Sequence, residues 1–341
     1  MMTTIFAFLL ITTVLLSYLA CGVYIRFSKR FNLIDSPNFR SSHSKPVPRG
    51  GGIVFASIFL FELIALYLFD DLTDKPLLYS LLGSGFAIML LGFADDIRHI
   101  PARWRLVVHF LSSAWVAYLL LISETEADMG SIIYWITILF AIFSQVWLLN
   151  LYNFMDGIDL ISTSETVTVV SCGAFLIWLT MPGDPSSLLL LLLIGALLGF
   201  LPWNISPASL FMGDAGSAFL GAIIGVFVIH SGLLSPNLTF AWLILLGVYI
   251  VDATTTLLRR ILNGQQFYQA HRTHAYQHAA IKFHSHTKVS VAVAMINLFW
   301  LMPLASATTF ELIPGPVAIV LAYFPLLITA YRFGAGTVQP T

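Results

Sequence analysis

Aspartate residues stand beside apolar stretches of this chain, where carboxylates could act on a proton or on a cation. Asp95 and Asp96 close one apolar run, and two adjacent carboxylates there are costly unless they bind a cation or transfer a proton. Neighbouring residues on a helix point about 100° apart, so one aspartate can face a site while the other supports it. Two solvated aspartates, one of them neutralised by Arg98, are the simpler alternative.

A further aspartate, Asp214, opens another apolar run within the segment FMGDAGS (211–217). It could simply cap a helix, a role that contributes about 1 kcal/mol. Capping does not explain Gly213 and Gly216, which lower helix propensity and would leave room for a ligand. Mg²⁺ usually takes one or two carboxylates and completes its shell with water and phosphate oxygens. Asp214 together with a substrate pyrophosphate fits that description.

Polar residues recur at every third position in the segment NLYNFMDGID (150–159). On a helix or a 3₁₀ turn, this spacing gathers amides and carboxylates into one stripe. Such groups suit a nucleoside, with its ribose hydroxyls and base edges, or a hard cation. A set of solvated turn residues is the alternative.

Glycines and basic residues precede the second apolar run. The glycines at 50–52 would let backbone N–H groups approach an anion, and a helix N-terminus adds a favourable partial charge. Arg40, Lys45 and Arg49 bring positive charge to the same place. The alternative is an ordinary basic anchor with a flexible hinge.

Histidines gather late in the chain, between 271 and 286. Zinc is disfavoured because no cysteine lies nearby. Arg272 with His274 fits a clamp for phosphate oxygens better. We expect surface positions for three further histidines: His278, His284 and His286.

Composition indicates which fold must position these clusters. Of 341 residues, 58% are hydrophobic and only 10% charged, with a mean hydropathy of +0.88. Soluble domains carry roughly 25% charged residues, so this chain cannot cover a soluble surface. We predict an all-α integral membrane protein with a single domain, 1–341. Cys21 and Cys172 lie in apolar runs and suggest neither a disulfide framework nor a metal site.

Apolar stretches of about 16–22 residues recur along the chain, near the roughly 20 that cross a bilayer core. We predict eleven transmembrane helices, at 4–25, 53–69, 77–93, 106–122, 131–149, 166–181, 188–203, 217–234, 239–258, 289–308 and 316–333. Basic residues follow the first span and none precedes it, which predicts an N-terminus outside and a C-terminus inside. Every Lys and Arg except Lys75 then falls on the cytoplasmic side, and all five polar clusters lie in cytoplasmic loops.

Taken together, the five clusters resemble the polyprenyl-phosphate N-acetylhexosamine-1-phosphate transferases, or glycosyltransferase family 4. The matching segments are PxPRGGG (46–52), GFxDD (92–96), NxxNFMDGID (150–159), FMGDAGS (211–217) and HRxHxYQ (271–277). The RSSH…PRGGG and HRTHAYQ forms look most like the branch that initiates lipopolysaccharide and O-antigen synthesis. Tyr276 and Gln277 stand where other branches carry histidines, so no role is transferred to either.

This resemblance implies a Mg²⁺-dependent enzyme of the bacterial inner membrane, with Mn²⁺ as an alternative ion. It would transfer a hexosamine-1-phosphate from a UDP-sugar to undecaprenyl phosphate and release UMP. The family's paired aspartates suggest Asp95 as general base and Asp96 as its partner near the metal, with Asp214 as a direct metal ligand. The nucleotide is expected at Asn153, Asp156, Asp159, Asn204 and Phe211, and phosphates at Arg49, Gly50, Gly51, Arg272 and His274.

Several questions stay open at this point. The sequence does not decide which UDP-sugar is used, whether a covalent intermediate forms, or whether the protein is a homodimer. Nothing in it indicates nucleic acid as a partner, and no role is assigned to Glu62 or Asp252.

A secondary transporter is the main alternative. Transporters place ionisable residues near the bilayer midplane on broken helices, often in repeated halves. Here the polar clusters lie at span ends on one face; Glu62 and His230 are exceptions without an obvious charged partner. A scaffold protein would not need five aspartates on one side.

Overall fold

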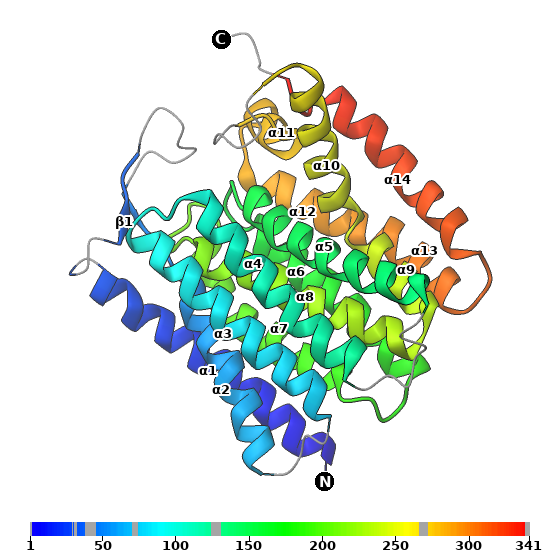
Figure 1. The fold of residues 1–341 in the computed structure, drawn as a ribbon. Helices are drawn as coiled ribbons and strands as arrows, with labels where there is room; N and C mark the ends of the chain where they lie inside the picture. The colour runs from blue at the N-terminus through cyan, green and yellow to red at the C-terminus, as the bar shows by residue number, and fades with distance from the viewer. Residues whose placement is uncertain are drawn as a thin grey trace.

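The computed structural model describes residues 2–28, 30, 33–37, 46–69, 74–123, 131–265 and 272–337. These residues form a bundle of packed helices with one short hairpin (Figure 1). The elements are α1 (Met2–Ser28), β1 (Ile34–Asp35), β2 (Val47–Pro48), α2 (Gly52–Leu68), α3 (Lys75–Ile97), α4 (Ala102–Ala117), the π-helical turn η2 (Tyr118–Ile122), α5 (Ile132–Met155), α6 (Ile161–Thr180), α7 (Ser186–Asn204), α8 (Asp214–Leu234), α9 (Pro236–Leu245), α10 (Gly247–Leu262), α11 (Ala275–Phe283), α12 (His286–Ile296), the π-helical turn η3 (Asn297–Leu301), α13 (Met302–Thr309) and α14 (Gly315–Arg332). Arg40 and Lys45 lie outside the described residues.

The predicted class, an all-α integral membrane protein, is confirmed. Among the described residues, nine helical segments are long and apolar enough to cross a membrane. Helices α9 and α10 together make a tenth such segment with a bend of 67°, and α2 is apolar but shorter. Each of the eleven predicted spans coincides with one of these segments. The count of eleven spans and the orientation of the chain stay predictions.

One predicted span, 239–258, is wrong as a continuous helix, because the chain bends between α9 and α10. Hydropathy gives no signal there, since the residues on both sides of the bend are apolar. Two contacts with α14 accommodate the break: Gly247 packs against Tyr323, and the Tyr323 hydroxyl donates to the Leu243 carbonyl at 2.7 Å. A neighbouring helix thus satisfies a carbonyl near the break, as membrane proteins require.

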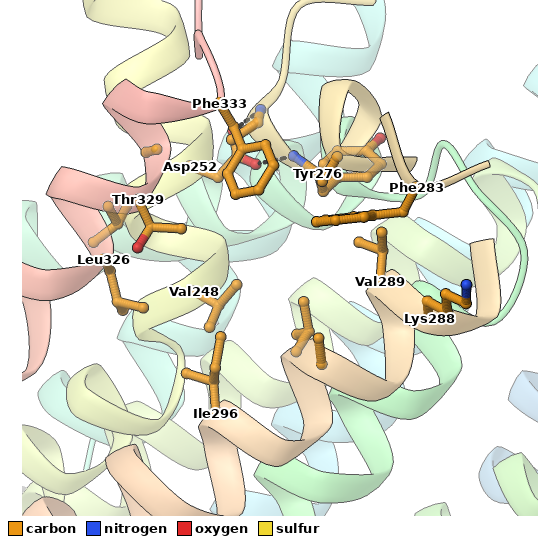
Figure 2. Close-up of a pocket in the computed structure, with 16 residues that line it drawn as sticks. Val248, Asp252, Tyr276, Phe283, Lys288, Val289, Ile296, Leu326, Thr329 and Phe333 are labelled. Carbon is orange, nitrogen blue, oxygen red and sulfur yellow. Dashed lines mark hydrogen bonds between the residues drawn. The ribbon is translucent and has the colours of Figure 1, made fainter. Parts of the chain in front are cut away.

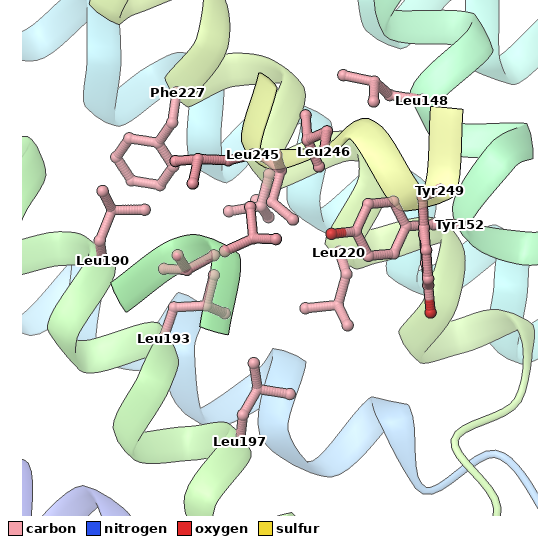
Figure 3. Close-up of a cluster of buried hydrophobic side chains, with 14 of the residues drawn as sticks. Leu148, Tyr152, Leu190, Leu193, Leu197, Leu220, Phe227, Leu245, Leu246 and Tyr249 are labelled. Atoms are coloured by element: carbon pink, nitrogen blue, oxygen red, sulfur yellow. The ribbon is translucent and has the colours of Figure 1, made fainter. Parts of the chain in front are cut away.

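Helix α8 lies at the centre of the bundle and packs against α2, α3 and α5. Its small residues allow this close approach: a Cβ at Gly221 would lie 2.6 Å from the Leu148 carbonyl oxygen. Figure 3 shows the core beside α8, where Leu220 and Phe227 face leucines of α7 and residues at the bend. The central helix therefore fixes the ends of the helices around it, including the end that carries Asp214.

Two further expectations fail because tertiary contacts override them. His230 does have a charged partner, since its Nε2 lies 3.2 Å from Asp184 Oδ2. The predicted span 166–181 begins too late in the chain, because α6 begins at Ile161 and buries Glu165 fully. The amide of Asn297 donates to Glu165 at 2.6 Å, which compensates for the burial of this carboxyl group.

Candidate active site

Asp96 joins the end of α3 to the start of α8. Its Oδ1 accepts a hydrogen bond from the backbone N–H of Asp214 at 3.2 Å, and its Oδ2 accepts one from Ala215 at 3.1 Å. The carboxylate is 5% exposed and caps α8 from another helix, where the helix dipole favours negative charge. Gly213 has φ +71°, and a Cβ there would lie 2.6 Å from Asp96 Oδ2.

The glycines around Asp214 are therefore explained by close packing. The space beside Gly213 is filled by Asp96, and a Cβ at Gly216 would lie 2.3 Å from Met212 Cγ and 2.8 Å from Gly52 Cα. The prediction that Gly213 and Gly216 leave room for a ligand is wrong, because protein atoms occupy that room.

Asp95 and Asp214 share a guanidinium that the sequence did not single out. Arg105 Nη1 lies 2.9 Å from Asp95 Oδ2 and 3.0 Å from Asp214 Oδ2. Asp95 is buried and also accepts from the backbone N–H of Ile100, whereas the Asp214 side chain is 32% exposed. Arg105 lies in the first turns of α4, close after the aspartates in sequence, but basic residues are so common at such helix ends that its position carried no signal.

We define the aspartate cluster as Asp95, Asp96 and Asp214. Asp95 and Asp214 lie at the guanidinium of Arg105, and the guanidinium of Arg49 lies close to Asp96, so the three carboxylates outnumber the two guanidinium groups. Within the ranges described, no group of three or more His, Cys, Asp and Glu side chains is arranged to hold a metal ion alone. The cluster fits Mg²⁺ instead, because this ion takes one or two carboxylates and fills its shell from water and phosphate.

Arg49 and the glycines after it are held by backbone contacts. The Arg49 guanidinium donates to the carbonyl of Asp96, which is the end of α3. The N–H groups of Gly51 and Gly52 donate to the Phe211 and Met212 carbonyls at 2.9 and 2.8 Å. These bonds fasten the start of α2 beside the aspartate cluster, while the phosphate-binding roles of Arg49, Gly50 and Gly51 stay predictions.

Asn204 holds together two loops of the expected nucleotide pocket. Its Oδ1 accepts from the Leu160 N–H at 3.1 Å and from the Thr163 hydroxyl at 2.9 Å. Its Nδ2 donates to the Leu210 carbonyl at 3.2 Å, and the residue is buried. Asn204 therefore links the start of α6 to the loop that precedes α8.

Asp159 is buried just before α6. Its Oδ2 lies 3.2 Å from His286 Nδ1 and accepts from the Ala208 N–H at 3.3 Å. Burial would raise the pKa of Asp159, but hydrogen bonds from His286 and Ser206 outweigh it and hold the pKa below its ordinary value. The expected surface position of His286 is wrong, because α12 begins directly against Asp159.

Asn153 and Asp156 lie near the aspartate cluster. The Asn153 amide donates to the Ser217 hydroxyl at 3.4 Å, about one turn beyond Asp214 on α8. Asp156 ends α5 and is half-buried. Burial raises its pKa to about 7, the charges of Asp96 and Asp159 act in the same direction, and a hydrogen bond with Ser162 opposes them. Phe211 is half-buried and lies on the loop before Asp214.

Helix α11 lies between the predicted spans 239–258 and 289–308, where the sequence predicts a loop. It begins directly after His274 and contains His278. The Tyr276 hydroxyl donates to the Phe154 carbonyl at 3.1 Å, which joins α11 to the 150–159 stripe. His274 is 3% exposed and caps α11, directly after Arg272 and Thr273. His278 is buried with its Nδ1 2.7 Å from the Phe333 carbonyl, so its predicted surface position is wrong, whereas His284 is exposed as expected.

An apolar cavity of about 430 Å³ lies beside α11, between α10, α12 and α14 (Figure 2). Apolar side chains such as Val248, Val289 and Ile296 form most of its wall. Asp252 and Tyr276 lie at the end of the cavity nearest the start of α11.

Comparison with known proteins now bears on this site. The model of glycosyl transferase family 4 matches residues 78–232. The probable undecaprenyl-phosphate N-acetylglucosaminyl 1-phosphate transferase of Bacillus subtilis is 29% identical, over 79% of this chain and 75% of that protein. The decaprenyl-phosphate N-acetylglucosaminephosphotransferase of Mycolicibacterium smegmatis is 28% identical, over 96% and 89%. Over residues 78–232 the chain is similar to glycosyl transferase family 4.

A third relative is the phospho-N-acetylmuramoyl-pentapeptide-transferase of Wolbachia pipientis wMel, 26% identical over 76% of this chain and 81% of that protein. The predicted resemblance is thus confirmed at the level of the family, and the lipopolysaccharide branch stays a prediction. The family 4 match contains the aspartate cluster and all five expected nucleotide residues. Arg49, the glycines and α11 lie outside it.

Proposed function

We propose that this protein transfers an N-acetylhexosamine-1-phosphate from a UDP-sugar to a polyprenyl phosphate at the cytoplasmic face of a bacterial inner membrane. The observation that carries the proposal is the aspartate cluster, built from α3 and α8 inside the part that matches family 4. Two of the relatives are named as transferases that act on undecaprenyl and decaprenyl phosphate, which supports a polyprenyl phosphate as the acceptor.

The reaction is a phosphoryl transfer. An oxygen of the acceptor phosphate attacks the β-phosphorus of the UDP-sugar, the bond between that phosphorus and the bridging oxygen breaks, and UMP leaves. Asp95 receives the proton of a monoprotonated acceptor phosphate, a modest task because the second phosphate pKa is about 6. The guanidinium of Arg105 beside Asp95 favours the ionised carboxylate, which is the form that accepts a proton.

Asp214 and Asp96 would hold a divalent cation, Mg²⁺ or Mn²⁺. Bound there, the cation would neutralise pyrophosphate charge and stabilise the leaving UMP. The guanidinium of Arg105 lies within ion-pair distance of both Asp95 and Asp214, which shows that these carboxylates attract a positive charge to this position.

The stripe at 150–159 would bind the uridine nucleotide. Asn153 and Asp156 are half-buried beside the cluster and would contact the nucleoside, with the Phe211 ring close by in sequence to Asp214. Asp159 and Asn204 have their oxygens engaged with loop amides and hydroxyls, so they would shape the pocket.

Phosphate and lipid contacts would come from the other side of the site. Arg272 and His274 would hold phosphate oxygens, and the apolar cavity beside α11 suits part of a polyprenyl chain. The RSSH…PRGGG and HRTHAYQ segments support a role in initiating O-antigen or a related surface polysaccharide.

The test uses membranes that contain the protein, UDP-sugar labelled with ³²P at the β-phosphate, and undecaprenyl phosphate. A transferase produces labelled lipid and an equal amount of UMP. Substrate uptake into sealed vesicles without labelled lipid would indicate a transporter and overturn the proposal. Repeating the assay with UDP-GlcNAc, UDP-GalNAc and their 6-deoxy relatives identifies the sugar, because one hydroxyl contact decides such selectivity.

A further inference from the structure

Ser162 and Tyr249 carry buried hydroxyl groups to which the sequence assigned no role. Ser162 lies in the first turn of α6, and Tyr249 lies in the first turn of α10, directly after the bend between α9 and α10. The two hydroxyl oxygens are 3.1 Å apart, and Ser162 is 1% and Tyr249 0% exposed. Buried hydroxyl groups need partners inside the protein, and this contact joins α6 to α10.

The Ser162 hydroxyl also forms a hydrogen bond with the carboxylate of Asp156, which lies between α5 and α6. An ionised carboxylate can only accept, so the single proton of the Ser162 hydroxyl points to Asp156 and its oxygen accepts from Tyr249. The three groups therefore form a chain in which Tyr249 donates to Ser162 and Ser162 donates to Asp156. Each hydrogen bond polarises the next, which strengthens the bond to the carboxylate.

This chain of hydroxyls runs from the core to the proposed nucleotide pocket. At its inner end, the Tyr249 ring packs against the Tyr152 ring of α5, with the ring centroids 5.0 Å apart (Figure 3). At its outer end, Asp156 is only half-buried. Side chains packed in a core keep one orientation, so the two fixed hydroxyls can hold a carboxylate that would otherwise rotate between rotamers.

We propose that Ser162 and Tyr249 are positioning residues of the nucleotide pocket, which hold the Asp156 carboxylate in one orientation toward the nucleoside. They act through Asp156 and do not touch substrate. This inference rests on the proposed function, since it needs a nucleoside at Asp156. The competing explanation is that the two hydroxyls only satisfy each other where α6 meets α10.

Other ionisable groups also act on Asp156. Burial raises its pKa to about 7 against the opposing hydrogen bond of Ser162, and the charges of Asp96 and Asp159 add to the rise. The hydroxyls of Tyr249 on α10 and Tyr276 on α11 lie close enough to feel the charge of Asp156. Replacing Ser162 by alanine leaves the two aspartates in place and removes the hydrogen bond.

Calorimetry with uridine at several pH values tests the inference. The ionised carboxylate is the better acceptor for ribose hydroxyls, so affinity rises as the pH passes the pKa of Asp156. Loss of a hydrogen bond to the ionised form raises that pKa, so Ser162→Ala should move the midpoint of the rise upward by about one pH unit, and Tyr249→Phe by about half a unit.

Two further results are expected from the same titrations. Above the midpoint, Ser162→Ala should still bind uridine roughly three- to tenfold more weakly than the wild-type protein, because its carboxylate is ionised but no longer held in one orientation. In the Asp156→Ala background, Ser162→Ala should have no further effect, because residues that act as one unit are not additive.

The matched control is Tyr152→Phe, which removes the hydroxyl of the other buried tyrosine and leaves the contact between Tyr249 and Ser162 intact. It should keep the wild-type midpoint. An unchanged midpoint in Ser162→Ala, an equal loss of affinity in the Asp156→Ala background, or an equal shift in Tyr152→Phe would overturn the inference. Absence of uridine binding by the wild-type protein would instead be a failure of the proposed function.

A second measurement does not depend on a nucleoside. In infrared spectra of the purified protein, the carboxyl band of protonated Asp156 is identified by its absence from Asp156→Asn. The pH at which half of this band has disappeared should be higher in Ser162→Ala than in the wild-type protein. The same midpoint in both proteins would overturn the inference, whatever calorimetry gives.

Discussion

Helices α3 and α8 lie side by side, and aspartates gather at each end of this pair of helices. At one end, Asp74 accepts from the Leu77 N–H at 2.9 Å and Asp184 accepts from the Ser186 N–H at 2.9 Å, so each caps a helix a few residues away. His230 lies between them, 3.2 Å from Asp184 and 3.9 Å from Asp74. We call these three residues the distal cluster.

At the other end, the carboxylates contact residues that are distant in sequence. Asp96 caps α8, more than a hundred residues along the chain, and Arg105 joins Asp95 to Asp214. The distal cluster needs no further partner, because a histidine separates two carboxylates that are already capping. The aspartate cluster carries three carboxylates beside the guanidinium groups of Arg105 and Arg49, and the Asp214 side chain is 32% exposed. From this difference we infer that the distal cluster stabilises the fold, and we propose that the aspartate cluster binds the cation and the substrate.

The substitution Asp214→Asn is the strongest test of the difference between the two clusters, because it keeps the shape of the side chain and removes its charge. We expect turnover to fall at least ~10²-fold, the order lost with other electrostatic contacts to a transition state. The initial rate of lipid labelling at saturating Mg²⁺ measures this effect. Near-normal turnover would remove Asp214 from the metal site.

Asp95→Asn tests the proton step and should lower the rate about 10²-fold. Part of the rate should return between pH 6 and 8, because the acceptor phosphate then ionises unaided. Direct attack also predicts no exchange of label between UMP and UDP-sugar without lipid acceptor. If the rate of Asp95→Asn does not change with pH, Asp95 is not the general base. Exchange of label in lipid-free enzyme would contradict direct attack and indicate a covalent intermediate.

Asp156 should make nucleoside binding depend on pH. Its pKa is raised to about 7, so it gains negative charge as the pH rises from 6 to 8. The ionised carboxylate is the better acceptor for ribose hydroxyls, so affinity for uridine should rise, by roughly tenfold at most over this range. Calorimetry with uridine avoids the titration of a phosphate. Asp156→Asn should flatten the profile, and an unchanged profile in that variant would exclude Asp156 from the pocket.

The smallest effect on activity is expected in the distal cluster. His230→Gln should leave turnover close to wild type and lower the melting temperature by about 2–4 °C, since a buried hydrogen bond contributes about 1 kcal/mol. Burial raises the pKa of Asp184, but hydrogen bonds from His230 and Ser186 hold it below its ordinary value. Its contribution to stability is therefore present above the ordinary aspartate pKa and is lost as the pH falls through the lowered one. Lost turnover with an unchanged melting temperature would mean that the distal cluster serves catalysis.

The sequence predicted those features that depend on neighbouring residues. Hydropathy located the apolar segments, and short motifs located Asp95, Asp96 and Asp214. The sequence did not predict those features that depend on contacts between segments far apart in the chain. Arg105 resembled any other basic residue at a helix end, and the contact between Tyr249 and Ser162 becomes visible only after the chain bends at Gly247.

The same reason explains the errors over individual residues. The sequence predicts a surface position for His286 because its partner, Asp159, lies far away in sequence. It predicts space for a ligand at Gly213 because nothing near this glycine in the sequence shows that Asp96 fills that space. The sequence therefore predicted which residues gather near the site better than it predicted which residues they contact.

The central claim is that the aspartate cluster, and not the distal cluster, forms the cation site. Electron paramagnetic resonance of Mn²⁺ added to the purified protein, with and without UDP-GlcNAc, tests it most directly. We predict one bound Mn²⁺ per chain in the wild-type protein and in His230→Gln, tightened by the nucleotide sugar, and loss of this binding in Asp214→Asn. Wild-type Mn²⁺ binding by Asp214→Asn, or its loss in His230→Gln, would contradict the claim.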